Sequence, residues 1–234
     1  MKTKEASIVG VALIVAAFIF GLFFYASRVT KENISVIGTA TKRYQSDIIK
    51  WRVIITRFAD LKDMKTGYDQ LQKDEVTLVE LLKANGVDST DITIQPVNSD
   101  QKFDRYGQQI GFNLRQIIFV ISKDIPKVEK LALNPKFIVD KGIIMDSATV
   151  EYYFSNLPEI KRELLALATQ DAKKRAVEIA KNAGVKLNKL ISARSGIFQI
   201  NEPFSTEVQS YGVYNTATRQ KDINITLNAT YTLK

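Results

Sequence analysis

The sequence contains no cysteine and no histidine among its 234 residues. Without cysteine there is no disulfide framework, thiolate nucleophile, iron–sulfur cluster or lipid-modified cysteine. Without histidine the commonest general base and the commonest zinc ligand are also missing. Catalysis would have to use Asp, Glu, Lys, Ser, Thr or Tyr. We therefore expect no catalytic residue, no cofactor site and no metal site, and we predict that the protein is not an enzyme.

Proline and glycine are scarce as well, with 5 and 11 residues. Together with 45% hydrophobic and 25% charged residues, this composition is typical of a globular chain and argues against disorder. Lys and Arg number 33 and Asp and Glu number 25, which leaves a formal charge of +8. Such a surplus favours contact with polyanions or anionic lipid head groups, but it does not determine a fold.

The longest uncharged run covers residues 6–26, ASIVGVALIVAAFIFGLFFYA. At roughly 1.5 Å per residue, a helix of this length spans about 31 Å, close to the hydrocarbon thickness of a bilayer. Cleaved secretory signals have shorter apolar cores and a small-x-small cleavage site, whereas Phe24 lies two positions before Ala26 here. We predict an uncleaved signal anchor over residues 1–29, with residues 6–26 in the lipid bilayer; a cleaved signal is the alternative.

The charges around this run indicate an orientation only weakly. Lys2 and Lys4 lie on one side, and Arg28 and Lys31 lie on the other. Long domains translocate largely regardless of charge, so we place residues 30–234 outside the cytoplasm as one domain. The expected location is therefore single-pass in the inner membrane, with a periplasmic domain that carries a net charge of +6.

Three segments show the alternation that predicts β-strands. Residues 33–44 predict a strand that ends near Gly38, and residues 47–58 predict a strand whose outer face is partly covered. Residues 221–234 alternate most regularly, as expected for an antiparallel strand with one dry face. The apolar positions of the second and third strands are Ile49, Trp51, Val53 and Ile55, then Ile223, Ile225, Leu227, Ala229, Tyr231 and Leu233.

Helical periodicity appears in residues 63–85, where Gly86 is a natural stop and Glu75 is expected at the helix edge. Residues 91–103 and 107–122 predict a long hairpin, residues 123–134 predict a short helix with Pro126 in its first turn, and Gly142 precedes another strand. The apolar stripe of the first of these helices is Tyr68, Leu71, Leu78, Val79 and Leu82.

A third helix is predicted after a cap at Ser155 or Asn156. Its apolar stripe is mostly alanine, so the helix can approach a sheet closely: Leu165, Ala168, Ala172, Ala176, Ile179, Ala180 and Ala183. The opposite face mixes Lys with acids and lacks clustered Arg or aromatic stacking partners, so we expect no nucleic acid partner. Leu167 and Val177 project from this charged face and would suit a subunit interface if exposed together.

The fold class that these elements predict is α+β, with antiparallel sheets, packed helices and one preceding transmembrane helix. The helix exits LLKANGVDSTDITI and AKNAGVKLNKLIS are similar, since each passes from a helix through Gly-Val to a strand. This similarity suggests two β-α-β-β units that face one another.

Several segments follow one another in a characteristic order: ISVIGTA, NGVDSTDITIQPV, IGFNLRQIIFVISKDIPKVEKL, KGIIMDSATVEYYFSN and NAGVKLNKLISA. Through them residues 33–234 resemble the SIMPL domain family, a domain of unknown function in many bacterial periplasmic and membrane-anchored proteins. Three positions depart from the family pattern. Ala40 stands in place of the family's second glycine, Ser46 in place of the usual proline, and KGII in place of an aliphatic-Gly-Ala-Asn pattern.

This resemblance implies an α+β fold, an extracytoplasmic location and a tendency to self-associate. One periplasmic member of the family forms a large ring-like oligomer, some members are linked to envelope or oxidative stress, and an animal member is a kinase-associated signalling adaptor. The family has no established catalytic residues to carry over to this chain.

Isolated motifs give little support to catalysis. Ser99 and Lys102 match S-x-x-K but lie in a polar hairpin arm without the accompanying motifs. The carboxylate pairs Asp60 with Asp63 and Asp74 with Glu75 would serve hydrolysis only if the fold brought them together. Aromatic residues that could line a cleft, but more commonly fill a core, are Trp51, Tyr152, Tyr153 and Phe154.

Two hypotheses follow. The first is a membrane-tethered extracytoplasmic scaffold that forms homo-oligomers, has a function linked to the envelope or to stress, and binds a protein partner that the sequence does not name. The alternative is a carboxylate-based hydrolase or a binder of anionic envelope polymers, which requires a pocket with two converging carboxylates or a continuous Lys/Arg groove.

Overall fold

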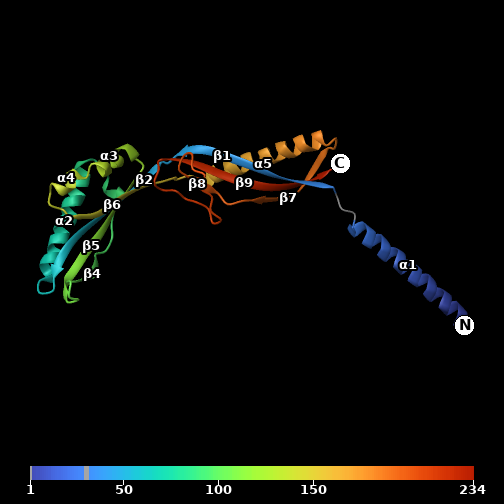
Figure 1. Ribbon diagram of the computed structural model, residues 1–234, viewed down its shortest axis with the longest axis horizontal. Coiled ribbons are helices and arrows are strands. Elements are labelled where there is room, and N and C mark those ends of the chain that lie inside the picture. Colours follow the sequence, from blue (N-terminus) through green and yellow to red (C-terminus); the bar gives the residue numbers. More distant parts are fainter. Residues whose placement is uncertain (1, 29–31) are drawn as a thin grey trace. The chain divides into compact units, whose positions relative to one another are not determined.

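The computed structural model describes residues 2–28 and 32–234 (Figure 1). The predicted boundary between residues 29 and 30 and the position of Lys31 lie outside the described residues, so that boundary stays a prediction. The helices and strands are α1 (Lys2–Arg28), β1 (Asn33–Gln45), β2 (Ile48–Asp60), α2 (Met64–Ala84), η1 (Ser89–Asp91), β3 (Ile92–Ile94), β4 (Asn98–Phe103), β5 (Gln109–Ser122), α3 (Ile125–Leu133), α4 (Lys136–Val139), β6 (Met145–Tyr153), α5 (Leu157–Asn182), β7 (Leu187–Ser195), β8 (Gln199–Asn201) and β9 (Gln220–Leu233).

The chain divides into two compact units. The first contains the described residues up to Ala40 together with Leu165–Gly196 and Thr226–Lys234. The second contains Thr41–Leu164 and Ile197–Ile225. The architecture confirms the predicted mixed α+β class with antiparallel sheets and a preceding apolar helix.

The apolar helix α1 extends beyond the uncharged run at both ends. Its segment Ile8–Tyr25 is long and apolar enough to cross a membrane, and none of it is buried. A fully exposed apolar helix of this length is expected for a chain that places it in lipid. The helix is therefore a candidate membrane anchor.

In the first unit, α5 packs on a sheet with the strand order β1-β9-β7, and β7 pairs antiparallel to β9. Strand β1 continues through Gly38, so the predicted end of the strand there is wrong. A Cβ atom at Gly38 would lie 2.2 Å from the main-chain oxygen of Ala168 and 2.6 Å from Cβ of Ala172. Glycine at this position therefore marks close helix–sheet packing and not a turn.

The buried stripe of α5 differs from the prediction at its edges. Ala168, Ala172, Ala176 and Ala180 are buried as expected, but Ile179 is 50% exposed. Ala183 is exposed, and Leu164 is the buried residue in place of the half-buried Leu165. Buried positions recur every four residues, so the stripe drifts around the helix, as expected above a twisted sheet.

The second unit has a five-stranded sheet with the order β3-β5-β2-β6, in which β4 also pairs with β5. Figure 1 shows α2 and α3 alongside this sheet. Strand β2 is central, and its four predicted core residues, Ile49, Trp51, Val53 and Ile55, are fully buried. The predicted hairpin of residues 91–122 is confirmed, with one arm divided into β3 and β4. The short helix α4 has no counterpart among the predictions.

Helix α2 begins after the cap Asp63 and ends before Gly86, whose φ is +82°. Leu71, Leu78 and Leu82 are buried as predicted. Tyr68 is 41% exposed and does not belong to the buried stripe. The stripe includes the buried Asp74 instead, because a cation from β2 reaches it.

Only one of the two predicted β-α-β-β units lies within one sheet. Strand β2, helix α2, and the β3/β4 arm with β5 form the first. For the second, β6 precedes α5 in the chain but pairs with β2, whereas β7 and β9 pair in the other sheet. The sequence similarity of the two helix exits therefore reflects local chain geometry and not two equivalent sheets.

Candidate interaction surface

A long loop, residues 202–219, connects β8 to β9 in the second unit. It contains only isolated turns and one bridge, between Ile200 and Tyr214. The loop escapes prediction from periodicity because its apolar residues follow neither a helical nor a strand repeat. Its length is the signal that could have found it, since ordered loops of more than about 12–15 residues without secondary structure are commonly functional.

Two buried amide side chains of β8 hold this loop. The Gln199 side chain is 5% exposed; its Nε2 donates to the main-chain oxygen of Gln209 at 2.9 Å, and its Oε1 accepts from the Val213 amide at 2.9 Å. Asn201 Nδ2 donates to the main-chain oxygen of Glu207 at 2.7 Å. These bonds satisfy loop backbone groups that lack strand partners, which gives the loop a defined conformation.

A fully buried lysine holds the other end of the loop. Lys221 Nζ donates to the main-chain oxygens of Asn215 at 2.5 Å and Thr218 at 2.6 Å. Burial lowers the pKa of Lys221 to about 8, although the nearby charge of Glu202 opposes the shift. One signal for this residue was present in the sequence: Lys221 precedes Ile223 by two residues and therefore lies on the dry face of β9.

The loop presents apolar side chains to solvent. The exposed fractions of Phe204, Val208 and Tyr211 are 87%, 74% and 95%. Phe204 has a φ of 65°, and its ring lies under the Arg43 guanidinium at 4.4 Å from the centroid. Asp222 accepts from Arg43 at 2.7 and 2.8 Å and from the Phe204 amide at 3.2 Å. The tip of the loop is therefore held although its side chains have no apolar cover.

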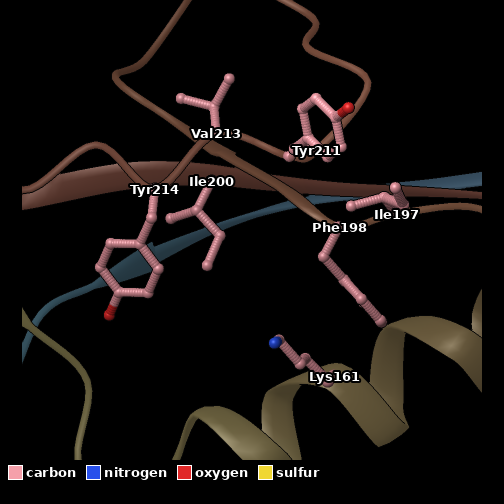
Figure 2. Close-up of a pocket in the computed structure, with 8 residues that line it drawn as sticks. Lys161, Ile197, Phe198, Ile200, Tyr211, Val213 and Tyr214 are labelled. Atoms are coloured by element: carbon pink, nitrogen blue, oxygen red, sulfur yellow. The ribbon is translucent and has the colours of Figure 1, made fainter.

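A groove of about 320 Å³ lies beside the loop (Figure 2). Figure 2 shows the amine of Lys161 extending from its helix toward Phe198 and Ile200, and Nζ lies 5.4 Å from the centroid of the Phe198 ring. Within the described residues Lys161 forms no ion pair. The groove is lined by Lys161, Ile197, Phe198, Ile200, Tyr211, Gly212, Val213 and Tyr214.

Gly212 allows the loop to form one wall of this groove. Its φ is +88°, and a Cβ atom there would lie 2.9 Å from both Ile197 Cγ2 and the Phe198 carbonyl oxygen. Any other residue would strain the backbone and push against Ile197 or Phe198. The surface thus combines a defined loop, an apolar groove and one cation that has no anionic partner in the part of the chain that the structure describes.

A second pocket, of about 480 Å³, tests the predicted hydrolase alternative because Asp47, Glu159 and Glu163 line it. Burial opposes ionisation of Asp47, but hydrogen bonds from the hydroxyl and amide of Ser155 together hold its pKa below the ordinary value. Hydrogen bonds from Lys42 and Tyr44 lower the pKa of Glu163.

The lowered pKa values keep Asp47 and Glu163 ionised at neutral pH. A general acid that donates a proton near pH 7 needs the opposite shift. Glu159 accepts from Arg162 at 2.7 Å and so also has a cationic partner. The partners of all three carboxylates favour a structural role for them.

The carboxylates named in pairs from the sequence each form hydrogen bonds with other groups. Asp60 accepts from the Lys62 amide, and Asp63 caps α2 through the Thr66 amide. Asp74 instead pairs with Arg57 of β2. Among the described residues no cluster of three acidic side chains could hold a metal ion.

Glu75 is half-buried, and its carboxylate accepts from Gln116 Nε2 at 2.7 Å, which agrees with the predicted edge position. Ser99 and Lys102 are exposed on β4.

The aromatic residues named from the sequence mostly belong to the core. Trp51 is fully buried and Tyr152 is 8% exposed, and both belong to the hydrophobic core of the second unit. Phe154, also 8% exposed, lines the pocket with Asp47, and Tyr153 packs on Tyr214 with ring centroids 6.0 Å apart.

On the charged face of α5, Leu167 and Val177 are 40% and 44% exposed, as predicted.

Comparison with models of known protein families gives a match. The SIMPL family, described as proteins of unknown function (DUF541), matches residues 34–232, which is most of the chain. This match confirms the resemblance seen in the sequence motifs. No curated protein matches the chain significantly.

Proposed function

We propose that this chain, which belongs to the SIMPL family of proteins of unknown function, is a membrane-tethered interaction protein. It would self-associate outside the cytoplasm and catalyse no reaction. Its role would be that of a scaffold in the cell envelope. Four features support this function: the apolar helix α1, the missing cysteine and histidine, the hydrogen-bonded carboxylates of the second pocket, and the exposed loop.

The loop of residues 202–219 carries the proposal. Three buried polar side chains, Gln199, Asn201 and Lys221, fix a loop that exposes Phe204 and Tyr211 to solvent. Large exposed aromatic side chains on a fixed scaffold are typical of protein–protein contact surfaces, where they lose little conformational entropy on binding. A loop with only a connecting role would need neither feature.

The tether and its orientation are tested in intact cells. We expect the full chain to fractionate with the inner membrane and to resist alkaline extraction, as an uncleaved α1 requires. External protease should digest residues 32–234 after the outer barrier is opened, without lysis of the inner membrane. Recovery of a soluble chain that lacks residues 1–29, or digestion only after lysis, contradicts the proposal.

Self-association is tested on the full chain in mild detergent. We expect two differently tagged copies to purify together and the protein mass from light scattering to exceed that of one 26.4 kDa chain. A strict monomer at tens of micromolar contradicts the proposal.

A further inference from the structure

We propose that the loop tip of one copy, residues 204–208, docks in the groove beside Lys161 of a second copy, with Phe204 against the apolar wall and Glu207 opposite Lys161. This inference rests on the proposed self-association and adds the two surfaces that meet. It concerns only residues of the second unit, in which the groove and the loop both lie.

The groove selects for a particular kind of group. Its walls are aromatic and aliphatic, and Lys161 is the one charged residue that lines it. Among the described residues this lysine has no acidic partner, and its amine points into the groove (Figure 2). An apolar side chain with a carboxylate nearby satisfies both features, since charge-assisted hydrogen bonds are stronger than neutral ones.

The loop tip has that chemistry. In the run Glu202-Pro-Phe-Ser-Thr-Glu-Val208 the exposed Phe204 and Val208 are flanked by two carboxylates. Glu207 is exposed and accepts from Gln209 Nε2, but it forms no ion pair within the described residues. The tip therefore supplies the apolar group and the anion that the groove lacks.

The tip does not fill the groove of its own copy. None of residues 202–208 lines that groove. Asn201 donates a hydrogen bond to the main-chain oxygen of Glu207, and Asp222 accepts one from the Phe204 amide. These bonds fix the position of the tip within its own copy. A tip and a groove that complement each other but do not meet within one chain are expected to meet between two copies.

Introduced cysteines test this contact directly, because the natural chain has none. Full-length Thr206→Cys with one tag is mixed in detergent with full-length Ile197→Cys with another tag, and an added copper–phenanthroline oxidant forms any available disulfide. We expect a cross-linked pair carrying both tags at a yield at least about tenfold above the control mixture, in which Ser99→Cys on β4 replaces Thr206→Cys. Equal yields in the two mixtures overturn the proposal.

Charge exchange gives a second readout that a folding defect does not imitate. We expect Lys161→Glu and Glu207→Lys each to weaken self-association about tenfold, measured by light scattering over a dilution series. The double variant should recover most of the loss, because the pair is restored in reverse. Lys102→Glu on the exposed strand β4 of the same unit is the matched control and should change association little. A double variant no better than either single variant overturns the proposal.

Failure of this contact is distinguishable from failure of the proposed function. If the wild-type chain is monomeric, self-association itself is wrong. If the wild-type chain associates but the cysteine pair and the charge exchange behave like their controls, the copies meet through another surface and only the tip-in-groove contact is wrong.

Discussion

Arg57 of β2 and Asp74 of α2 form a two-point ion pair, with Nε 2.5 Å from Oδ2 and Nη2 3.0 Å from Oδ1. The Asp74 side chain is 9% exposed and the Arg57 side chain is 21% exposed. Arg57 also donates to the main-chain oxygen of Gly142 at 2.7 Å. One strand, one helix and the start of the β6 segment are therefore joined through a single guanidinium group.

Removal of one partner of this pair should destabilise the second unit. Asp74→Ala leaves the Arg57 charge half-buried with only the Gly142 oxygen, so we expect a loss of about 2–3 kcal/mol in the free energy of unfolding. Urea unfolding measures it. The exposed pair Glu159 and Arg162 is the control, where Glu159→Ala should cost less than about 0.5 kcal/mol. Equal losses at the two pairs would contradict this account.

Gly38→Ala should destabilise the first unit strongly. The added methyl group overlaps the Ala168 oxygen and the Ala172 methyl group, and neither is the end of a flexible side chain. Helix α5 must move away from β1, at a cost of about 1–3 kcal/mol or more. Thermal unfolding checks this. Ile37→Ala, at a 57% exposed position of the same strand, should have a much smaller effect.

Ala172→Leu should overpack the same interface from the helix side. Ala172 is fully buried, so three additional carbon atoms have no space, and we expect a loss of about 1–3 kcal/mol. Val177→Leu on the exposed face of α5 is the matched control, with an expected change within about 0.5 kcal/mol. An Ala172→Leu variant as stable as the wild type in urea would show that the helix packs loosely.

Lys221 should make stability depend on pH in the alkaline range. Its pKa is about 8 in the folded protein against 10.5 ordinarily, so between these values the unfolded chain binds more protons. The stability contributed by Lys221 therefore rises with pH from 8 to 10.5 and is constant below 8. Comparison of the wild type with Lys221→Met isolates this contribution.

We expect the free energy of unfolding of the wild type to gain on the order of 1–2 kcal/mol relative to Lys221→Met between pH 7.5 and 9.5. Measurements should stop at about pH 9.5 because two tyrosines cause the opposite change above about pH 10. The pKa values of Tyr44 and Tyr152 are raised to about 12, mainly by burial and also by hydrogen bonds to Glu163 and Glu129 respectively. Parallel pH profiles of the two proteins would show that Lys221 titrates normally.

Strands with one dry face were predictable from the sequence. Ile223 to Tyr231 in β9 alternate without interruption, and Ile49 to Ile55 in β2 alternate except at Ile54, which is also buried, so the period of two identifies both the strand and its main buried side. Gly38 was misread because glycine marks both turns and close packing, and only the alanines of α5 distinguish the two. That information lies more than a hundred residues away in the chain.

The candidate interaction surface was much less predictable. Gln199 and Asn201 look like ordinary surface amides in the sequence, and their burial depends on where the loop folds back over β8. The ion pair of Asp74 was not predicted, because its partner, Arg57, precedes it by 17 positions on another element. Long-range pairing of polar groups leaves no periodic trace, whereas burial of apolar groups does.

The φ of 65° at Phe204 places a residue with a bulky side chain in a left-handed conformation that normally costs it roughly 1–2 kcal/mol. Glycine or asparagine would sit there with less strain, so selection for thermal stability alone would remove the phenyl ring. Mutants recovered from a screen for heat resistance should therefore include replacements at position 204, and those same mutants should bind other copies poorly. The stability of the folded chain and the binding between copies would then favour different residues at position 204.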